Sequence, residues 1–416
     1  MSRSSHTTAA VVVLGALFFL FGFTTWINGP LIGYLKIICE LKDGAEPFYV
    51  TFAFYIAYFV TALPMSALLQ RTGMKKGMMY GLFTMAVGAL LFIPAAQGRS
   101  YALFLLGLFV IGTGLSLLQT ASNPYITVVG PIESAAARIS IMGICNKLAG
   151  VLAPIILGSV LLGDAATLKT ELAALDPSSY AMRLDEVAGR VIMPYGIMAV
   201  VLFGLGLMVR FSPLPELDPE VDSPEAANDG RGILSFPNLV LGVIALFLYV
   251  GVEVMAGDTI GLYGESQGMS LEESKSLTSY TLGCMVIGYI IGIFGIPKLF
   301  SQSKALAASA VLGVLLTVAA IMLSGKASVY CIALLGLANA LVWPAIWPLA
   351  IAGLGRHTKT GSALLIMAIA GGAVLPLLYG SLAGGSLGHQ NAYWIMVPCY
   401  LFMLWYGVKG SRILRW

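Results

Sequence analysis

Long, unbroken apolar stretches recur along the whole of this chain, and they constrain its fold more than any other feature. Of its 416 residues, 58% are hydrophobic and only 10% are charged, whereas a soluble globular chain carries about 25% charged residues. Apolar stretches of about 20 residues match the thickness of a bilayer core. A transmembrane barrel would instead alternate apolar and polar residues. The sequence therefore predicts an all-α integral membrane protein whose outer surface contacts lipid.

Twelve membrane-spanning helices are predicted from the positions of these stretches. They are expected near 9–36, 47–70, 77–96, 101–129, 137–162, 189–211, 236–264, 271–299, 304–324, 328–354, 359–385 and 390–410.

The connections between the spans suggest two halves. Residues 212–235 are rich in Pro, Asp and Glu, a composition typical of a flexible linker. The predicted organisation is a six-helix bundle over 1–211, a cytoplasmic linker over 212–235 and a second six-helix bundle over 236–416. The loop 163–188 is also long, and its segment ATLKTELAALD is predicted to form a short surface helix.

Basic residues in the short loops predict which ends of the helices face the cytoplasm, because positive charge concentrates on that side of a membrane protein. The residues that carry it are Arg71, Lys75, Lys76, Lys298, Lys304, Arg356 and Lys359. Their loops share one side with both termini, so both termini are predicted to be cytoplasmic.

The two halves resemble each other in sequence. AGVLAPIILG (149–158) matches GGAVLPLLYG (371–380) in a Gly, a Pro and a final Gly, and the first span can be laid on the seventh by superposing Gly22 on Gly251. Two similar bundles that rock about a central site are what an alternating-access transporter requires. The repeat therefore favours a transporter over a channel or a receptor.

Three charged residues stand well inside the predicted spans, whereas the other charges cluster at the ends of the spans. An ionisable group in such a position is costly unless it is paired or hydrated. Lys147 lies in the fifth span, and Glu253 and Asp258 lie in the seventh. The two acids are five residues apart, so we expect them to point in different directions. We predict that Lys147 pairs with one of these two acids, Asp258 in preference to Glu253, in a pair that breaks and re-forms as the site is occupied. The alternatives are a static ion pair and a lysine that reaches the interface.

Neutral polar and aromatic residues also collect in the spans. Amides can donate to and accept from the vicinal hydroxyls of a sugar, and an indole face packs on the C–H side of the ring. The candidate substrate-binding residues are Asn28, Gln119, Asn123, Asn146, Glu253, Asn339, Trp343 and Trp347. The alternatives are that the amides only join helices and that the tryptophans anchor the chain at the lipid interface.

Motifs of enzymes, cofactor sites and nucleotide sites are absent from the sequence. The five cysteines are scattered, with no metal-binding or disulfide spacing. The chain is therefore predicted not to be an enzyme, to use no cofactor and to bind no nucleic acid. Without a nucleotide site, transport would be driven by the gradient of an ion or of the substrate.

The sequence resembles the fucose/galactose/glucose symporters of the major facilitator superfamily, in particular the bacterial glucose/galactose permeases. The resemblance is carried by LFFLFGFTTWINGPLI (17–32), LLQTASNPYITVVGP (117–131), YVGVEV (249–254) and GSALLIMAIAGGAVLPLLYG (361–380). It implies the major facilitator fold, a bacterial inner-membrane location and the cation-coupled uptake of a hexose such as glucose or galactose.

The chain departs from this family at two positions. The proton-coupled fucose permeases carry an Asp after an Asn in the first span and a Glu in the fourth. The matching positions here hold Gly29, which follows Asn28, and Gln119. Neither residue can load and release a proton.

The missing acids favour sodium over a proton as the coupling ion. Lys147, Asp258 and Glu253 are the candidate coupling residues, and the predicted sodium site lies near Asp258, Thr25 and Asn28. The alternative functions are an uncoupled sugar facilitator and a transporter of an amino sugar or a deoxy sugar. The protein is expected to be a monomer.

Overall fold

The computed structural model is all-helical in the part of the chain that it describes, which comprises residues 3–128, 135–212, 232–295, 301–354 and 357–413. Helices are the expected outcome for apolar segments of this length, since backbone groups inside a bilayer must be satisfied within their own segment.

The helices fall into two groups along the chain. The first group contains α1 (Arg3–Trp26), α2 (Asn28–Ile38), α3 (Tyr49–Thr72), α4 (Met74–Leu90), α5 (Phe92–Gln97), α6 (Tyr101–Val128), α7 (Ala135–Leu161), α8 (Ala165–Ala174), α9 (Pro177–Gly189) and α10 (Ile192–Phe211), with the 3-10 turn η1 (Glu46–Phe48) before α3.

The second group begins after a short 3-10 turn, η3 (Ile233–Ser235). It contains α11 (Pro237–Asp258), α12 (Ile260–Ser266), α13 (Leu271–Ser274), α14 (Leu277–Gly295), α15 (Gln302–Met322), α16 (Gly325–Asn339), α17 (Val342–Ile351), α18 (Thr358–Met367), α19 (Gly371–Ala383), α20 (Gly388–Ala392) and α21 (Met396–Val408), with the 3-10 turns η5 (Ala368–Ala370), η6 (Tyr393–Ile395) and η7 (Gly410–Arg412).

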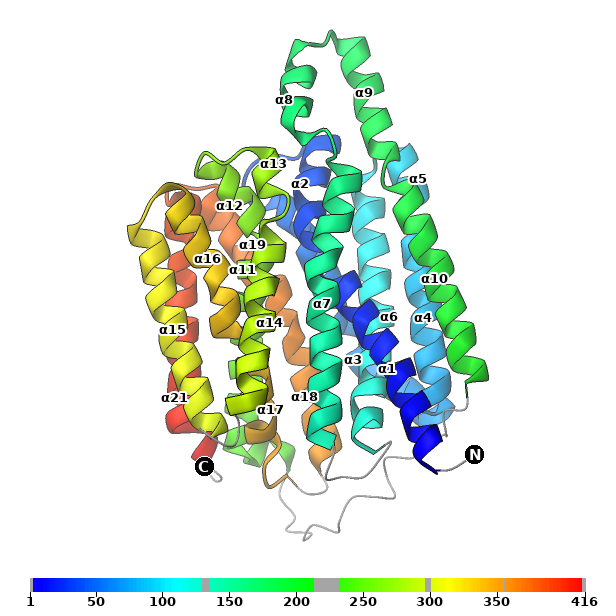
Figure 1. Ribbon diagram of the computed structural model, residues 1–416, viewed down its shortest axis with the longest axis vertical. Coiled ribbons are helices and arrows are strands. Elements are labelled where there is room, and N and C mark those ends of the chain that lie inside the picture. Colours follow the sequence, from blue (N-terminus) through cyan, green and yellow to red (C-terminus); the bar gives the residue numbers. More distant parts are fainter. Residues whose placement is uncertain (1–2, 129–134, 213–231, 296–300, 355–356, 414–416) are drawn as a thin grey trace.

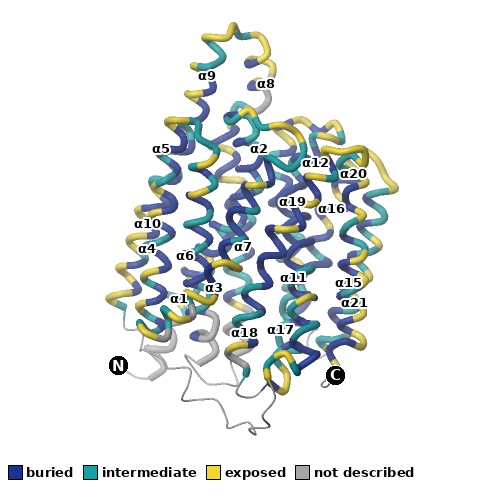
Figure 2. The backbone as a smooth tube through the Cα atoms, turned by 180° about the vertical axis from the view of Figure 1, so that it is seen from behind, coloured by how far each residue is buried: buried dark blue, intermediate teal, exposed yellow. Residues whose placement is uncertain are grey.

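Among the described residues, eleven helical segments are long and apolar enough to cross a membrane. The twelfth predicted span, 390–410, falls on α20, η6 and α21, and α21 packs along α15 inside the second group. Large apolar side chains such as those of Met193, Val200 and Phe211 on α10 are exposed, as a lipid-facing surface requires. Figure 2 shows buried residues toward the middle of the bundle and exposed residues on its outer helices.

Most helices run along the long axis of the molecule (Figure 1). Both termini lie at one end, here called the termini end, and α8 and α9 project at the other, here called the α8–α9 end. Within the first group α4 and α3 pack on α6, and α1 packs on α7. Within the second, α15 packs on α21 and α16, and α11 packs on α19. The groups meet where α7 contacts α14 and α3 contacts α19.

The predicted division at 1–211, 212–235 and 236–416 remains a prediction, since residues 213–231 of the proposed linker lie outside the described part. The segment between α7 and α10 holds two helices where the sequence predicted one. The predicted surface helix is α8, and α9 follows it. A signal for α9 was present in the sequence: Asp176 precedes Pro177 and caps the backbone N–H groups of Ser178 and Ser179, a standard helix start.

Several of the predicted spans contain a break between two helical segments. The first breaks at Ile27 between α1 and α2, the seventh at Thr259 between α11 and α12, and the tenth between α16 and α17. A proline ring clashes with the carbonyl four residues earlier, so Pro30 ends α1 at Trp26, and Pro344 limits α16 in the same way. Broken helices in a membrane are found where they line a functional cavity.

Candidate functional site

A buried ion pair joins the two groups of helices. The Lys147 Nζ on α7 lies 2.8 Å from Glu253 Oε1 on α11, and the side chains are only 9% and 8% exposed. The prediction that Lys147 pairs with Asp258 is therefore wrong, since Glu253 is the partner. Glu253 lies five residues before Asp258, and this spacing directs the two carboxylates to different neighbours.

Trp26 is the third member of this cluster. Its ring lies 4.9 Å from Lys147 Nζ, in cation–π contact. A β-carbon at Gly150 on α7 would lie 2.7 Å from the ring, and one at Gly257 on α11 would lie 2.4 Å from it. The indole therefore fits between two glycines, one from each group, and it packs closely on both.

Asp258 is a second buried carboxylate, and it faces α3. It is 1% exposed, and the Thr51 hydroxyl donates to its Oδ2 over 3.3 Å. The buried Oδ1 has no hydrogen-bond partner among the residues that the structure describes. A buried carboxylate with a single neutral donor is costly, so a cation that neutralises Asp258 would stabilise this arrangement.

Asn28 and Asn339 are the most buried of the candidate amides. Neither Nδ2 nor Oδ1 of Asn28 has a hydrogen-bond partner in the described part of the chain, although the residue is fully buried at the break between α1 and α2. Asn339 Oδ1 accepts a hydrogen bond from the Tyr400 hydroxyl, while its Nδ2 is unpaired. Buried amide groups are rarely left unpaired, so these atoms are available to a polar ligand.

Two other candidate amides connect neighbouring helices of the first group. Asn146 donates to the Phe18 carbonyl over 3.4 Å, and Gln119 donates to the Tyr58 hydroxyl over 3.1 Å. Both are half-buried. The side chain of Asn123 lies outside the described residues.

The two candidate tryptophans stack on each other in α17. The rings of Trp343 and Trp347 are 5.4 Å apart and inclined by 25°, and Tyr249 of α11 lies 6.4 Å from Trp343. Both indoles are half-buried and pack against the core, as an aromatic wall of a cavity would. Thr25 is half-buried in α1, next to Trp26.

One functional face escaped the sequence reasoning. Thr51, Tyr55 and Tyr58 recur at helical spacing along α3, so they share one side of that helix. Thr51 contacts Asp258, and Tyr58 contacts Gln119. The spacing of these hydroxyls between apolar residues could have identified the face.

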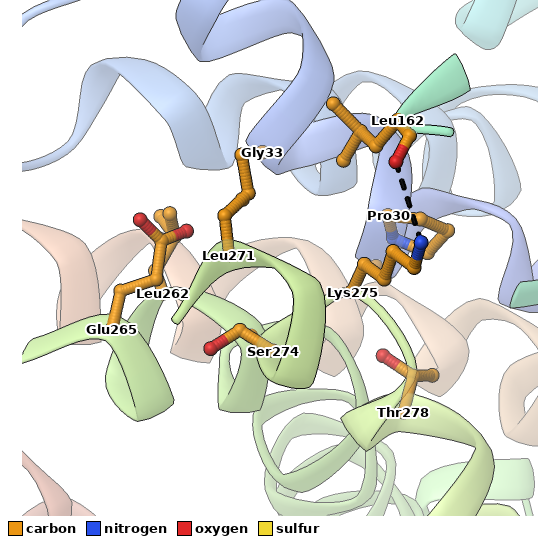
Figure 3. Close-up of a pocket in the computed structure, with 11 residues that line it drawn as sticks. Pro30, Gly33, Leu162, Leu262, Glu265, Leu271, Ser274, Lys275 and Thr278 are labelled. Atoms are coloured by element: carbon orange, nitrogen blue, oxygen red, sulfur yellow. Dashed lines mark hydrogen bonds between the residues drawn. The ribbon is translucent and has the colours of Figure 1, made fainter. Parts of the chain in front are cut away.

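At the α8–α9 end, a small pocket lies between the two groups (Figure 3). Gly29, Pro30 and Leu162 line it from the first group, and Ser274 and Lys275 are among those that line it from the second. Lys275 Nζ donates to the Leu162 carbonyl over 3.4 Å and so bridges the groups.

Within the described residues, no group of three or more His, Cys, Asp or Glu side chains could hold a metal ion. The predicted sodium site would rely instead on amide, hydroxyl and backbone oxygens beside Asp258. The Thr51 hydroxyl is the side-chain hydrogen-bond donor to that carboxylate in the described structure.

The fold and this central site together define a class of membrane transporter, and comparison with known proteins agrees. Residues 14–376 match the model of the Major Facilitator Superfamily. The chain belongs to that superfamily and, within it, to the fucose/galactose/glucose symporter family. This is a family of transporters and not of enzymes, as the sequence predicted.

The similarity covers nearly the whole chain. The glucose/galactose transporter of Brucella abortus (strain 2308) is 34% identical over 407 residues, which are 97% of this chain and 94% of the relative. The L-fucose-proton symporter of Escherichia coli K12 is 28% identical over 397 residues, 93% and 90% of the two chains. The crystal structure of FucP, a superfamily transporter in the outward conformation, superposes with a TM-score of 0.74 at 26% identity and covers 95% of this chain and 97% of that one.

Proposed function

We propose that this protein imports a glucose- or galactose-like hexose across the inner membrane of a bacterium by cation-coupled symport and alternating access. The observation that carries the proposal is the Lys147–Glu253 pair, buried between the two groups of helices. The relatives that match 97% and 93% of the chain carry the names glucose/galactose transporter and L-fucose-proton symporter. The protein is proposed to work as a monomer.

The ion pair is placed where it can hold the two groups of helices together. Its two charges come from opposite groups, so separating the groups at this level exposes both to water. A hexose that reaches Glu253 can offer hydroxyls to the carboxylate while the indoles of Trp343 and Trp347 cover the ring. The unpaired amide groups of Asn28 and Asn339 are further sites for sugar hydroxyls.

Asp258 is the proposed coupling carboxylate. The family's acids are replaced here by Gly29 and Gln119. Asp258, in contrast, is buried, has no cationic partner among the described residues and contacts α3 of the other group through Thr51. Either sodium or a proton can neutralise it. A sodium ion needs several oxygen ligands, and the described contact of Asp258 with one hydroxyl favours the proton.

The orientation follows from the basic loops. Residues such as Arg71, Lys75 and Lys76 lie at the termini end, so this end is assigned to the cytoplasm and the α8–α9 end to the outside. Contacts such as that of Lys275 with Leu162 then close the outer side in this structure.

An uncoupled facilitator is the second candidate, because the family's two acidic positions are absent. An amino sugar would be favoured as substrate by Glu253 if the carboxylate were freed from Lys147.

Counterflow in proteoliposomes tests the proposal. Vesicles preloaded with unlabelled glucose or galactose should take up the labelled sugar, and competition by amino and deoxy sugars should rank the substrates. Imposed pH and sodium gradients then separate symport from facilitation. Absence of counterflow for both glucose and galactose would overturn the assignment to these hexoses.

A further inference from the structure

Trp26 lies between the ion pair and the α8–α9 end. Its ring packs between Gly150 and Gly257, where added β-carbons would lie 2.7 and 2.4 Å from it. Gly150 lies three residues after Lys147 on α7. Gly257 lies four residues after Glu253 on α11, so each glycine is about one turn farther along its helix than the charged residue. Both helices lead toward the α8–α9 end (Figure 1), so the indole lies one turn outside the ion pair.

The Trp26 indole is held by packing and by the Lys147 ammonium. It is 2% exposed, and its buried cluster includes Leu282 and Met285 of α14. Its Nε1 has no hydrogen-bond partner among the residues that the structure describes, whereas Lys147 Nζ lies 4.9 Å from the ring centroid. A cation–π contact is strongest over an indole and away from water. The ring therefore fixes the ammonium from one side while Glu253 holds it from another.

Two hydrogen bonds between the groups lie beyond the indole. Ser279 Oγ on α14 donates to the Val151 carbonyl on α7 over 2.9 Å. Lys275 Nζ donates to the Leu162 carbonyl over 3.4 Å. Both carbonyls follow the Trp26 contact along the chain, so they lie closer to the α8–α9 end. Trp26 is the innermost of these three contacts, and it touches the ion pair directly.

We propose that Trp26 is a positioning residue, which holds the Lys147 ammonium against Glu253 and so makes closure of the α8–α9 end depend on the ion pair. The ring, Lys147 and Gly150 all belong to the first group of helices. When the groups separate at this end, the ring keeps these contacts and loses Gly257, and the ammonium loses Glu253 in the same movement. The inference rests on the proposed function, since it assigns these contacts to one step of alternating access.

The rate of reaction with a membrane-impermeant thiol reagent measures this closure without any sugar. Val151 is half-buried and packs against the Trp26 cluster, so the cysteine of Val151→Cys should react slowly with reagent added on the α8–α9 side of membrane vesicles. The rate measured without the introduced cysteine is subtracted. Adding Trp26→Leu should raise the rate by about tenfold, because leucine offers no π face and a desolvated cation–π contact is lost.

Trp26→Phe separates the cation–π contact from packing. Phenylalanine keeps a π face, so the rate should stay within about threefold of the wild-type rate. In the Lys147→Met/Glu253→Gln background no ammonium remains, and Trp26→Leu and Trp26→Phe should then react at equal rates. Trp405→Leu on α21 is the matched control, because its ring is 40% exposed, and it should leave the rate unchanged.

Two results would overturn the inference. One is an equal rate for Trp26→Leu and Trp26→Phe when Lys147 and Glu253 are present, and the other is a difference between them that persists when both charges are removed. Thermal unfolding checks that each variant is folded, and Trp26→Met replaces Trp26→Leu if leucine prevents folding. Failure of the function is distinguishable, because the labelling needs no sugar: wild-type protein without hexose counterflow would refute the transport proposal instead.

Discussion

At the scale of residues, the decisive feature is that the buried charges are unequally partnered. Lys147 and Glu253 neutralise each other at 2.8 Å across the two groups of helices. Within the described part of the chain, Asp258 has only the Thr51 hydroxyl as a hydrogen-bond partner. Removing one member of a buried pair leaves an uncompensated charge, which costs more than removing both. Substitutions in the Lys147–Glu253 pair and substitutions of Asp258 should therefore affect stability and transport independently.

Glu253→Gln should destabilise the protein by about 3 kcal/mol, since it leaves the Lys147 ammonium buried without an anion. The double variant Lys147→Met/Glu253→Gln should recover most of that loss but should not recover hexose counterflow. Thermal unfolding in detergent measures the first effect and proteoliposome counterflow the second. Full counterflow in the stable double variant would show that the pair has no part in transport.

A second ion pair, outside the membrane spans, predicts a dependence on pH. Asp164 accepts two hydrogen bonds from Arg190, at 2.5 and 2.6 Å, and these hold the pKa of Asp164 below its ordinary value of 3.8. A lowered carboxyl pKa stabilises the fold above the ordinary pKa, and this stability is lost as the pH falls through the folded value. Asp164→Asn should therefore lower the free energy of unfolding by about 1 kcal/mol at pH 7. Near pH 3 the decrease should be much smaller.

Unfolding midpoints of wild type and Asp164→Asn across this pH range give the measurement. Glu186→Gln is a suitable control, because Glu186 contacts Arg183 with a side chain that is 65% exposed. If the unfolding midpoint of Asp164→Asn lies as far below that of wild type at pH 3 as at pH 7, the role of the Asp164 carboxylate is not electrostatic.

At the scale of elements, the site depends on broken helices and on close contacts between them. Trp26, Asp258 and Asn339 each lie at the end of a helix that is interrupted within its span. Glycines allow the two groups to meet near these breaks, and they close the α8–α9 end. A β-carbon at Gly29 on α2 would lie 2.4 Å from Thr278 Oγ1 on α14.

Gly29→Ala should shift the protein toward an arrangement in which the α8–α9 end is open, because overpacking a close contact costs about 1–3 kcal/mol. A cysteine introduced at Ser274, which is 2% exposed and lines the pocket between the groups (Figure 3), should then react faster with a membrane-impermeant thiol reagent. Gly33→Ala is the matched control on the same helix, since nothing lies within 4 Å of its added carbon. Equal labelling rates in the two variants would contradict this role for the glycine contact.

At the scale of the whole molecule, composition and pattern were sufficient for the fold but not for the pairing of charges. Apolar runs of bilayer length predicted the helical membrane fold, and the motifs in the first, fourth and eleventh spans indicated the family. The choice between Glu253 and Asp258 as partner of Lys147 depends on how α11 is rotated against α7, which residue spacing alone does not determine. The α9 helix and the polar face of α3 were overlooked, although capping and spacing signals for both are present in the sequence.

This family member is proposed to transport a hexose together with a cation that neutralises Asp258. The most direct measurement compares wild type with Asp258→Asn in proteoliposomes, recording gradient-driven accumulation of labelled glucose and, in parallel, counterflow. Asn cannot exchange a proton and stays neutral, so we predict that the variant loses accumulation above equilibrium and retains counterflow. Accumulation at the wild-type level in Asp258→Asn would contradict the claim and would place the coupling elsewhere in the molecule.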